Sequence, residues 1–299
     1  MKDILYTVEK NDLDIMLCSI HSLIKVEKAN NLRLHIVCKD FEQEDYHKLY
    51  SFFKENGLVM NHIYPMDDFS CYLPGLDGKD IKWAKIFYPN IIKNIFNIHN
   101  LLYLDNATII VDELNDLYLY NDEINMVPTT TFKETKEKFH LHDYFDTSVM
   151  YINLDKWEKR NIENKVKAIL ESNKDLDIQD IINIALNGYI RKLAYKYNIN
   201  AYPYFFDNDE LKLLYRDTNI SFSEIEKARE NPIIVHINSL YNINPWQRNN
   251  VNPFNAAFKE LMEEVNPNFK LTTYNGIKLF AYSKTALKKK ILKDKQKTK

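Results

Sequence analysis

The sequence predicts an α/β protein with a mixed, mainly parallel sheet flanked by helices. In the first hundred residues, short apolar runs alternate with segments whose apolar side chains recur at helical spacing. A longer apolar run at residues 101–111, interrupted at Asp105, is typical of strands buried on both faces. Alternation of this kind predicts parallel strands in one sheet, because each crossover helix returns the chain to the same edge.

The expected elements follow one another through the chain. Apolar runs predict strands over residues 3–8, 32–38, 58–64, 101–111, 125–128, 148–154 and 233–237. Helical spacing predicts helices over residues 13–25, 42–54, 81–99, 161–171, 179–197 and 255–265. Pro89 is expected to kink or restart the third of these helices. Residues 66–80, 129–142 and 198–219 lack such spacing and are expected to be irregular.

Composition limits the class of protein. Aromatic side chains make up 13% of the 299 residues, against only five Gly, which favours a packed globular protein and excludes a glycine-rich phosphate loop. The three cysteines have no CxxC spacing, so neither a disulfide framework nor a zinc site is indicated. No apolar run reaches the length of about 18 residues that a membrane span needs. We therefore expect a cytoplasmic protein.

Charge is distributed unevenly along the chain. The net charge is -2, but residues 284–299 contain eight Lys and one Asp, so the rest of the chain is acidic. An acidic body disfavours nucleic acid as a partner. The basic tail has two interpretations: contact with an anionic membrane surface, which would make the protein peripheral on the inner face, or a solvated terminus. We divide the chain into a domain over residues 1–265 and a small C-terminal extension over residues 266–299.

Asp105 is the residue around which the predicted site is built. It follows Leu104 at the expected carboxyl end of a buried strand. In open α/β sheets ligands bind at that edge, where a carboxylate can hold a hard cation or a ribose hydroxyl. The other interpretation is an Asp that caps a loop.

Several ordered segments over about residues 3–265 resemble glycosyltransferase family 8. The family pattern LYLDxD corresponds to LYLDNA at residues 102–107, with Ala107 in place of the second acid. FNxGVMLINL corresponds to FDTSVMYINL at residues 145–154, and DQDxxN to IQDIIN at residues 178–183. HxxGxxKPW is echoed by His236 and by NPW at residues 244–246, with a spacing two residues longer. The resemblance implies a GT-A fold.

The resemblance also implies which residues bind the UDP-sugar donor. Three segments would contact the donor: the first strand with its loop, the helix around Lys85, and the LYLDNA strand. The contacting residues would be Thr7, Val8, Glu9, Asn11, Lys85, Asp105 and Asn106. Lys85 stands where the family carries an Arg, and it keeps the charge but not the fork geometry. The implied catalytic residues are Gln179 and Asp180, which would orient the donor sugar, and Asp146, which would hold a donor hydroxyl or stabilise oxocarbenium character.

A divalent cation, Mn²⁺ or Mg²⁺, is the implied cofactor. Asp105 and His236 would bind it, and it would neutralise the diphosphate leaving group. From the residues alone, His236 can equally be a satisfied histidine at a strand end. Gln179 and Asp180 can likewise be an ordinary first helical turn.

The implied activity is transfer of a hexose to a glycan, lipid-linked saccharide or glycoprotein acceptor with retention of configuration. The aromatic residues 202–206 form either an acceptor subsite or part of the core. The alternative function is a catalytically inactive glycosyltransferase-like binding or partner subunit, because departures from the family pattern cluster at the expected donor site. The departures are Ala107, Asp146, Ser148, Ile178 and Asn244.

Overall fold

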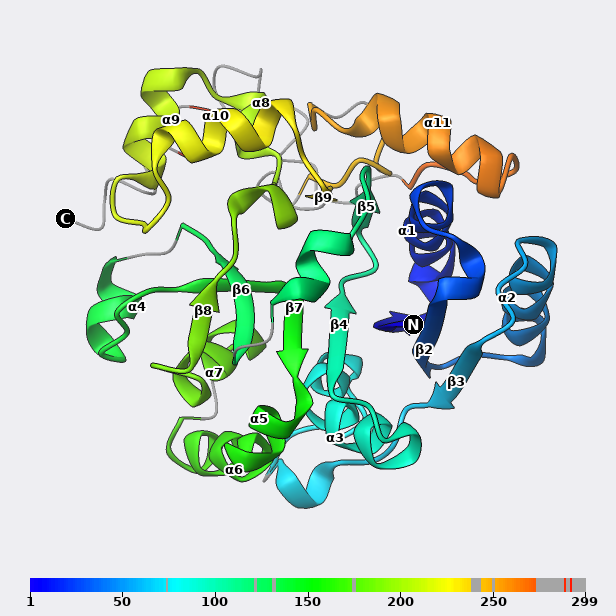
Figure 1. Cartoon of the computed structure of the whole chain (residues 1–299), viewed down its shortest axis with the longest axis horizontal. Helices are drawn as coiled ribbons and strands as arrows, with labels where there is room; N and C mark the ends of the chain where they lie inside the picture. Colours follow the sequence, from blue (N-terminus) through cyan, green and yellow to red (C-terminus); the bar gives the residue numbers. More distant parts are fainter. Residues whose placement is uncertain are drawn as a thin grey trace.

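The computed structural model describes residues 1–73, 75–120, 123–130, 133–173, 176–237, 243–248, 251–272, 288 and 291. A seven-stranded sheet with the order β3-β2-β1-β4-β7-β6-β8 forms its centre (Figure 1). The strands are β1 (Lys2–Glu9), β2 (Leu32–Lys39), β3 (Asn61–Pro65), β4 (Asn100–Leu104), β6 (Ile124–Pro128), β7 (Phe145–Asn153) and β8 (Ile190–Lys192). β1 to β4 are parallel, β7 runs antiparallel to β4 and β6, and β8 is parallel to β6. The predicted mixed, mainly parallel sheet is confirmed.

Helices cover both faces of this sheet. The apolar faces of α1 (Leu13–Val26) and α2 (Gln43–Glu55) belong to one buried cluster, together with side chains from β1, β2 and β4. The other cluster contains α3 (Ala84–Phe96), α5 (Leu154–Lys159), α6 (Ile162–Ser172) and α7 (Ile178–Ala185). β4 is therefore buried on both faces, as its apolar sequence predicts.

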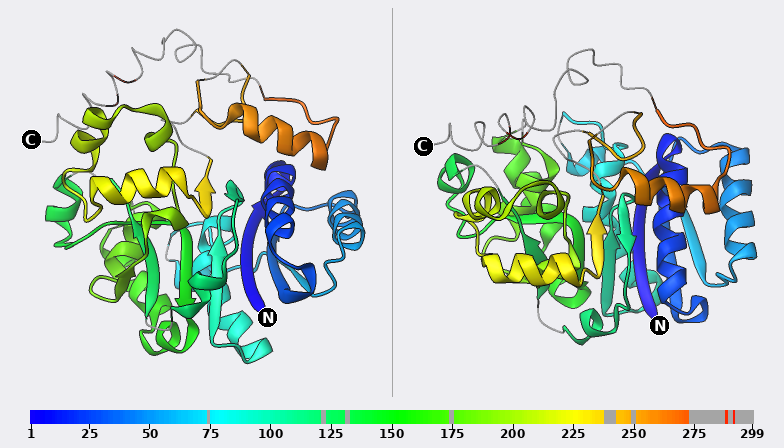
Figure 2. Two further views of the ribbon diagram at one scale, coloured as in Figure 1. Left: turned by 45° about the horizontal axis from the view of Figure 1, so that its top comes forward. Right: turned by 90° about the horizontal axis from the view of Figure 1, so that it is seen from above.

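A second, two-stranded sheet extends the first beyond the end of β4. Its strands are β5 (Thr108–Ile110) and β9 (Ile234–His236), which pair antiparallel. Both views of Figure 2 show β9 between α10 (Phe222–Glu230) and α11 (Asn255–Val265). The helices α8 (Tyr202–Phe205) and α9 (Asn208–Tyr215) lie at the same end of the molecule (Figure 1). The carboxyl end of β4 consequently faces a layer built from the C-terminal part of the chain.

Several element predictions were wrong. The helix expected over residues 179–197 ends at Ala185, because Gly188 has φ +80° and the chain then forms β8 and a 3-10 turn at Tyr195–Tyr197. Residues 198–219 contain α8 and α9, and α4 (Lys133–Lys138), α5 and α10 were not predicted. Pro89 lies inside the single helix α3, so no restart occurs there. β3 begins three residues later than expected, at Asn61.

The C-terminal residues pack on the body where they are described. α11 contacts α1, where Glu264 accepts hydrogen bonds from Lys25 (2.7 Å) and His21 (3.0 Å). Of the predicted basic tail only two residues are described: Lys288 pairs with Glu210 at 2.6 Å, and Ile291 is 1% exposed. The other tail positions lie outside the described residues, and the division at residue 265 stays a prediction. Among the described residues no helix is long and apolar enough to cross a membrane.

A chain of buried hydroxyls attaches β5 to the core. Ser19 of α1 lies 3.1 Å from the Tyr6 hydroxyl and 3.0 Å from the Thr108 hydroxyl, oxygen to oxygen. Ser19→Ala leaves two buried hydroxyls without this partner, so we expect the free energy of unfolding to fall by about 1–3 kcal/mol in urea titrations. Ser172→Ala, on the exposed side of α6, is the control and should change it by less than about 0.5 kcal/mol. Equal effects of the two substitutions would contradict the anchoring role of Ser19.

Candidate functional site

Asp105 lies at the carboxyl end of β4, as predicted. The register pairs Leu5 of β1 with Tyr103, so Asp105 follows β4 beside the end of β1. Its backbone N–H donates to the Ser148 carbonyl of β7 at 2.8 Å. Its Oδ1 atom accepts the Ala107 N–H at 3.0 Å. The carboxylate is held by its own turn and remains partly exposed, with 26% of the side chain accessible.

The β5–β9 pairing brings His236 to Asp105. Thr108 lies opposite His236 in this pair, three residues after Asp105. His236 Nε2 is 3.9 Å from Asp105 Oδ1, and the histidine is only 4% exposed. Nε2 is buried without a hydrogen-bond partner. An unpaired buried nitrogen is costly, which makes this atom a candidate for binding a ligand.

Asp146 approaches the same imidazole from its other nitrogen. It lies near the start of β7, where its Oδ1 atom accepts the Ser148 N–H at 2.8 Å. Its Oδ2 atom lies 3.9 Å from His236 Nδ1. The structure thus brings Asp105, Asp146 and His236 together at one edge of the sheet.

Lys85 supplies a buried positive charge next to these acids. Its Nζ atom donates to the Thr147 carbonyl at 3.4 Å and lies 4.7 Å from the centre of the Tyr103 ring. Burial alone would lower the pKa of Lys85, but Tyr103, Asp105 and Asp146 outweigh it and raise that pKa. Lys85 therefore stays protonated.

The predicted nucleotide-binding residues surround the end of β1. Thr7 Oγ1 lies 3.2 Å from the Tyr103 hydroxyl, which links Thr7 to the Lys85 environment. Val8 is buried, Glu9 is half-buried and Asn11 is exposed. Asp12, whose carboxylate hydrogen-bonds to Asn106, was not predicted as a site residue. Burial, Glu9 and Asp105 raise its pKa, and the only sequence signal was its place between a strand and a helix.

Gln179 and Asp180 lie in the first turn of α7, and hydrogen bonds hold α7 against β7 and the residue before it. Tyr144 donates from its hydroxyl to Asp180 Oδ1 at 2.6 Å, and the Thr147 N–H donates to Gln179 Oε1 at 3.4 Å. The Phe145 N–H donates to Asn183 Oδ1 at 2.8 Å. Sequence reasoning missed Tyr144, although it directly precedes the FDTS segment.

Two further observations bear on the site. No group of three or more His, Cys, Asp or Glu side chains within the described ranges is arranged to hold a metal ion.

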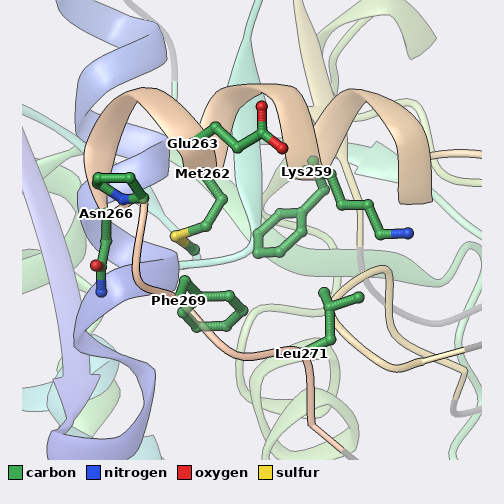
Figure 3. Close-up of a pocket in the computed structure, with 8 residues that line it drawn as sticks. Lys259, Met262, Glu263, Asn266, Phe269 and Leu271 are labelled. Atoms are coloured by element: carbon green, nitrogen blue, oxygen red, sulfur yellow. The ribbon is translucent and has the colours of Figure 1, made fainter.

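A pocket of about 220 Å³ lies between α11 and the segment after it (Figure 3). Met262, Phe269 and Leu271 line it, and none of the predicted site residues does.

The family model for glycosyl transferase family 8 matches residues 3–250. The chain belongs to this family. Family membership agrees with the motif segments that carry Asp105, Asp146 and Gln179.

Relatives and solved structures are similar over much of the chain. The general stress protein A of Bacillus subtilis is 24% identical over 195 residues, which cover 60% of this chain and 64% of that protein. The chain thus matches less than two thirds of that relative's length. The lipopolysaccharide 1,2-glucosyltransferase of Escherichia coli is 25% identical over 272 residues, 81% of this chain and 77% of that protein. The structure of galactosyltransferase LgtC with donor and acceptor sugar analogs has a TM-score of 0.67 at 17% identity, covering 88% of this chain and 96% of that one. This last likeness confirms the predicted GT-A type fold.

Removing the Tyr144 hydroxyl should alter the pH dependence of the site. Burial raises the pKa of Asp180, and the hydrogen bond from Tyr144 partly offsets this. In Tyr144→Phe that bond is lost, so the Asp180 pKa should rise further and, with Asp180 in its predicted catalytic role, the acidic limb of the kcat profile should move to higher pH. Tyr151→Phe is the matched control, because the Tyr151 hydroxyl is buried without a hydrogen-bond partner. Identical pH profiles for the two variants would exclude this positioning role.

Proposed function

We propose that this chain transfers a hexose from a UDP-sugar to a glycan, lipid-linked saccharide or glycoprotein acceptor with retention of configuration. The observation that carries the proposal is the convergence of Asp105, Asp146 and His236 beside the buried ammonium of Lys85. Carboxylates, an imidazole and an ammonium at the carboxyl edge of a sheet suit a sugar linked to a diphosphate. The names of the glucosyltransferase and galactosyltransferase relatives agree with a hexose donor.

The nucleotide would lie over the ends of β1 and β4. Thr7, Val8, Glu9 and Asn11 come from the end of β1 and the loop after it, and Asn106 from the turn after Asp105. The neighbouring carboxyl ends of two parallel strands leave backbone and side-chain polar groups free to bind a ligand. Lys85 would place its charge near the sugar and the diphosphate.

An imidazole nitrogen and a carboxylate, as supplied by His236 and Asp105, are ligand types that Mn²⁺ or Mg²⁺ accepts. The Nε2 atom of His236 is buried and unpaired and lies 3.9 Å from Asp105 Oδ1, so binding one ion at about 2.1 Å would draw the two groups closer together. Such an ion would stabilise the negative charge that develops on the leaving diphosphate.

The transfer step needs positioned partners more than a strong base. On the face from which UDP departs, the acceptor hydroxyl oxygen bonds to the anomeric carbon while the bond from that carbon to the β-phosphate oxygen breaks. That phosphate oxygen keeps the bonding electron pair and takes the acceptor proton. Gln179 and Asp180 would orient the sugar, and Asp146 would hold a hydroxyl or stabilise oxocarbenium character.

A screen of UDP-sugars tests the proposed function directly. Thermal shift with and without Mn²⁺ should show stabilisation by UDP and by at least one UDP-hexose, because a ligand that binds only the folded state raises its melting temperature. The stabilising donor should then release UDP slowly by hydrolysis. Nucleotide binding without any hydrolysis or transfer would favour the inactive partner subunit instead.

Asp105→Ala should weaken UDP binding in the presence of Mn²⁺ by about 10- to 100-fold, because His236 alone holds a divalent ion poorly. Isothermal titration calorimetry with and without EDTA measures the change. Asp112→Ala, seven residues further on and exposed, is the control. An unchanged affinity for the Asp105 variant would argue against its role as a ligand.

We infer a cytoplasmic location with peripheral contact to the inner membrane face through residues 284–299. The many lysines support this, and Ile291, which is 1% exposed, is not available to insert into a membrane.

Replacing Lys289, Lys290 and Lys293 with Gln should weaken co-sedimentation with anionic vesicles roughly a hundredfold at low salt, since each lysine contributes about 1 kcal/mol. The difference should shrink as salt shortens the Debye length. A variant with Gln at the exposed Lys28, Lys54 and Lys227 loses the same charge elsewhere and should bind like the unmodified chain. Equal binding by all three proteins would exclude the tail lysines as the membrane contact.

A further inference from the structure

The imidazole of His236 lies between two carboxylates that face its opposite nitrogens. Asp105 Oδ1 is 3.9 Å from Nε2, and Asp146 Oδ2 is 3.9 Å from Nδ1. Both distances exceed those of hydrogen bonds, about 2.7–3.2 Å. Because Nε2 is buried and unpaired, the ring is arranged for a ligand that completes its contacts.

Asp105 and Asp146 differ in whether the carboxylate oxygen that faces His236 also accepts a backbone hydrogen bond. Asp105 Oδ1 accepts a backbone N–H, and it is also the oxygen nearest Nε2. Asp146 uses Oδ1 for the Ser148 N–H, so Oδ2 is left to face the histidine. A metal-binding histidine commonly donates its other ring N–H to a carboxylate, which fixes the tautomer and strengthens the ligand.

Position 107 offers no negative charge to this site. The Ala107 side chain is a methyl group, and it belongs to the large apolar cluster, with 2% exposure. Asp105 would then be left as the single carboxylate beside Nε2, with part of its charge offset by Lys85. Asp146 is the acid that stands on the other side of the imidazole.

We propose that Asp146 supports the cation site from behind His236. When a divalent cation binds between Nε2 and Asp105, Asp146 Oδ2 accepts a hydrogen bond from Nδ1–H. This bond holds the imidazole in the tautomer whose Nε2 lone pair points at the ion, and it adds a second negative charge near the ion. The proposal rests on the proposed nucleotide-sugar site and adds a metal-supporting role to Asp146.

Mn²⁺ affinity measured by electron paramagnetic resonance in the presence of UDP tests this role. UDP carries no hexose, so the function of Asp146 toward a donor hydroxyl does not contribute. Asp146→Asn should weaken Mn²⁺ binding by about 10- to 100-fold. His236→Ala should abolish most of it, and melting curves without ligand confirm that each variant is folded.

Asp155→Asn is a matched control. Asp155 also pairs with a histidine, His99 Nδ1 at 2.8 Å, but at the amino end of β4, and the Asp155 side chain is half exposed. It should bind Mn²⁺ like the unmodified chain.

Equal Mn²⁺ affinity of Asp146→Asn and the unmodified chain would overturn the proposal. So would the absence of any Mn²⁺ binding by the unmodified chain. A Mn²⁺ titration without nucleotide distinguishes failure of this proposal from failure of the proposed function. If Asp146→Asn binds Mn²⁺ more weakly than the unmodified chain in that titration, the metal-supporting role of Asp146 is supported even if UDP does not bind. Hexose transfer that persists in EDTA would leave the proposed function standing without the metal site.

Discussion

The pairing of β5 with β9 is the constraint on which the site depends. β5 begins directly after the turn that holds the Asp105 carboxylate, and the pairing places His236 opposite Thr108. Ser22 adds to the hydroxyl chain on α1, because its side chain accepts the Ile110 N–H at 2.9 Å. Side chains alternate between the two faces of a strand, so a slip of one residue in β9 would turn His236 away from Asp105. The short strand β9 thus holds His236 close to Asp105, although the two residues are far apart in the sequence.

The charges gathered at this edge are costly unless they compensate one another. Burying an isolated ammonium is unfavourable, and Lys85 stays charged because Asp105, Asp146 and the Tyr103 ring lie near it. Negative charge also accumulates beside this edge: burial raises the pKa of Asp12, and the neighbouring Glu9 and Asp105 raise it further. Such an edge carries excess negative charge in the free protein, and a bound cation would relieve it.

Local patterns were sufficient for the long amphipathic elements and insufficient for the short ones. The helices α1, α2 and α11 follow their predicted ranges closely because each buries one regular face, and β1 and β2 do so because each is a mainly apolar run buried on both faces. The helix over residues 179–197 was wrong because apolar spacing continued past residue 185, where α7 ends, and past Gly188, whose φ of +80° lies outside the helical region. Asp105 at a strand end could be predicted from the chain itself. Its proximity to His236 came only from the family resemblance, since no local pattern encodes strand pairing, and neither route pointed to Asp12 or Tyr144.

Core packing and ligand binding compete at the turn after β4. The Ala107 methyl packs in the apolar cluster, while the Ala107 carbonyl accepts the Ile237 N–H at 2.9 Å, directly after β9. A carboxylate at this buried position would have to be desolvated, whereas Asp146 keeps 17% of its side chain accessible. An acid at the start of β7 therefore carries charge at lower cost than one in the turn. The apolar methyl of Ala107 thus packs beside the junction of β5 and β9 that positions His236, where a carboxylate would have to be desolvated.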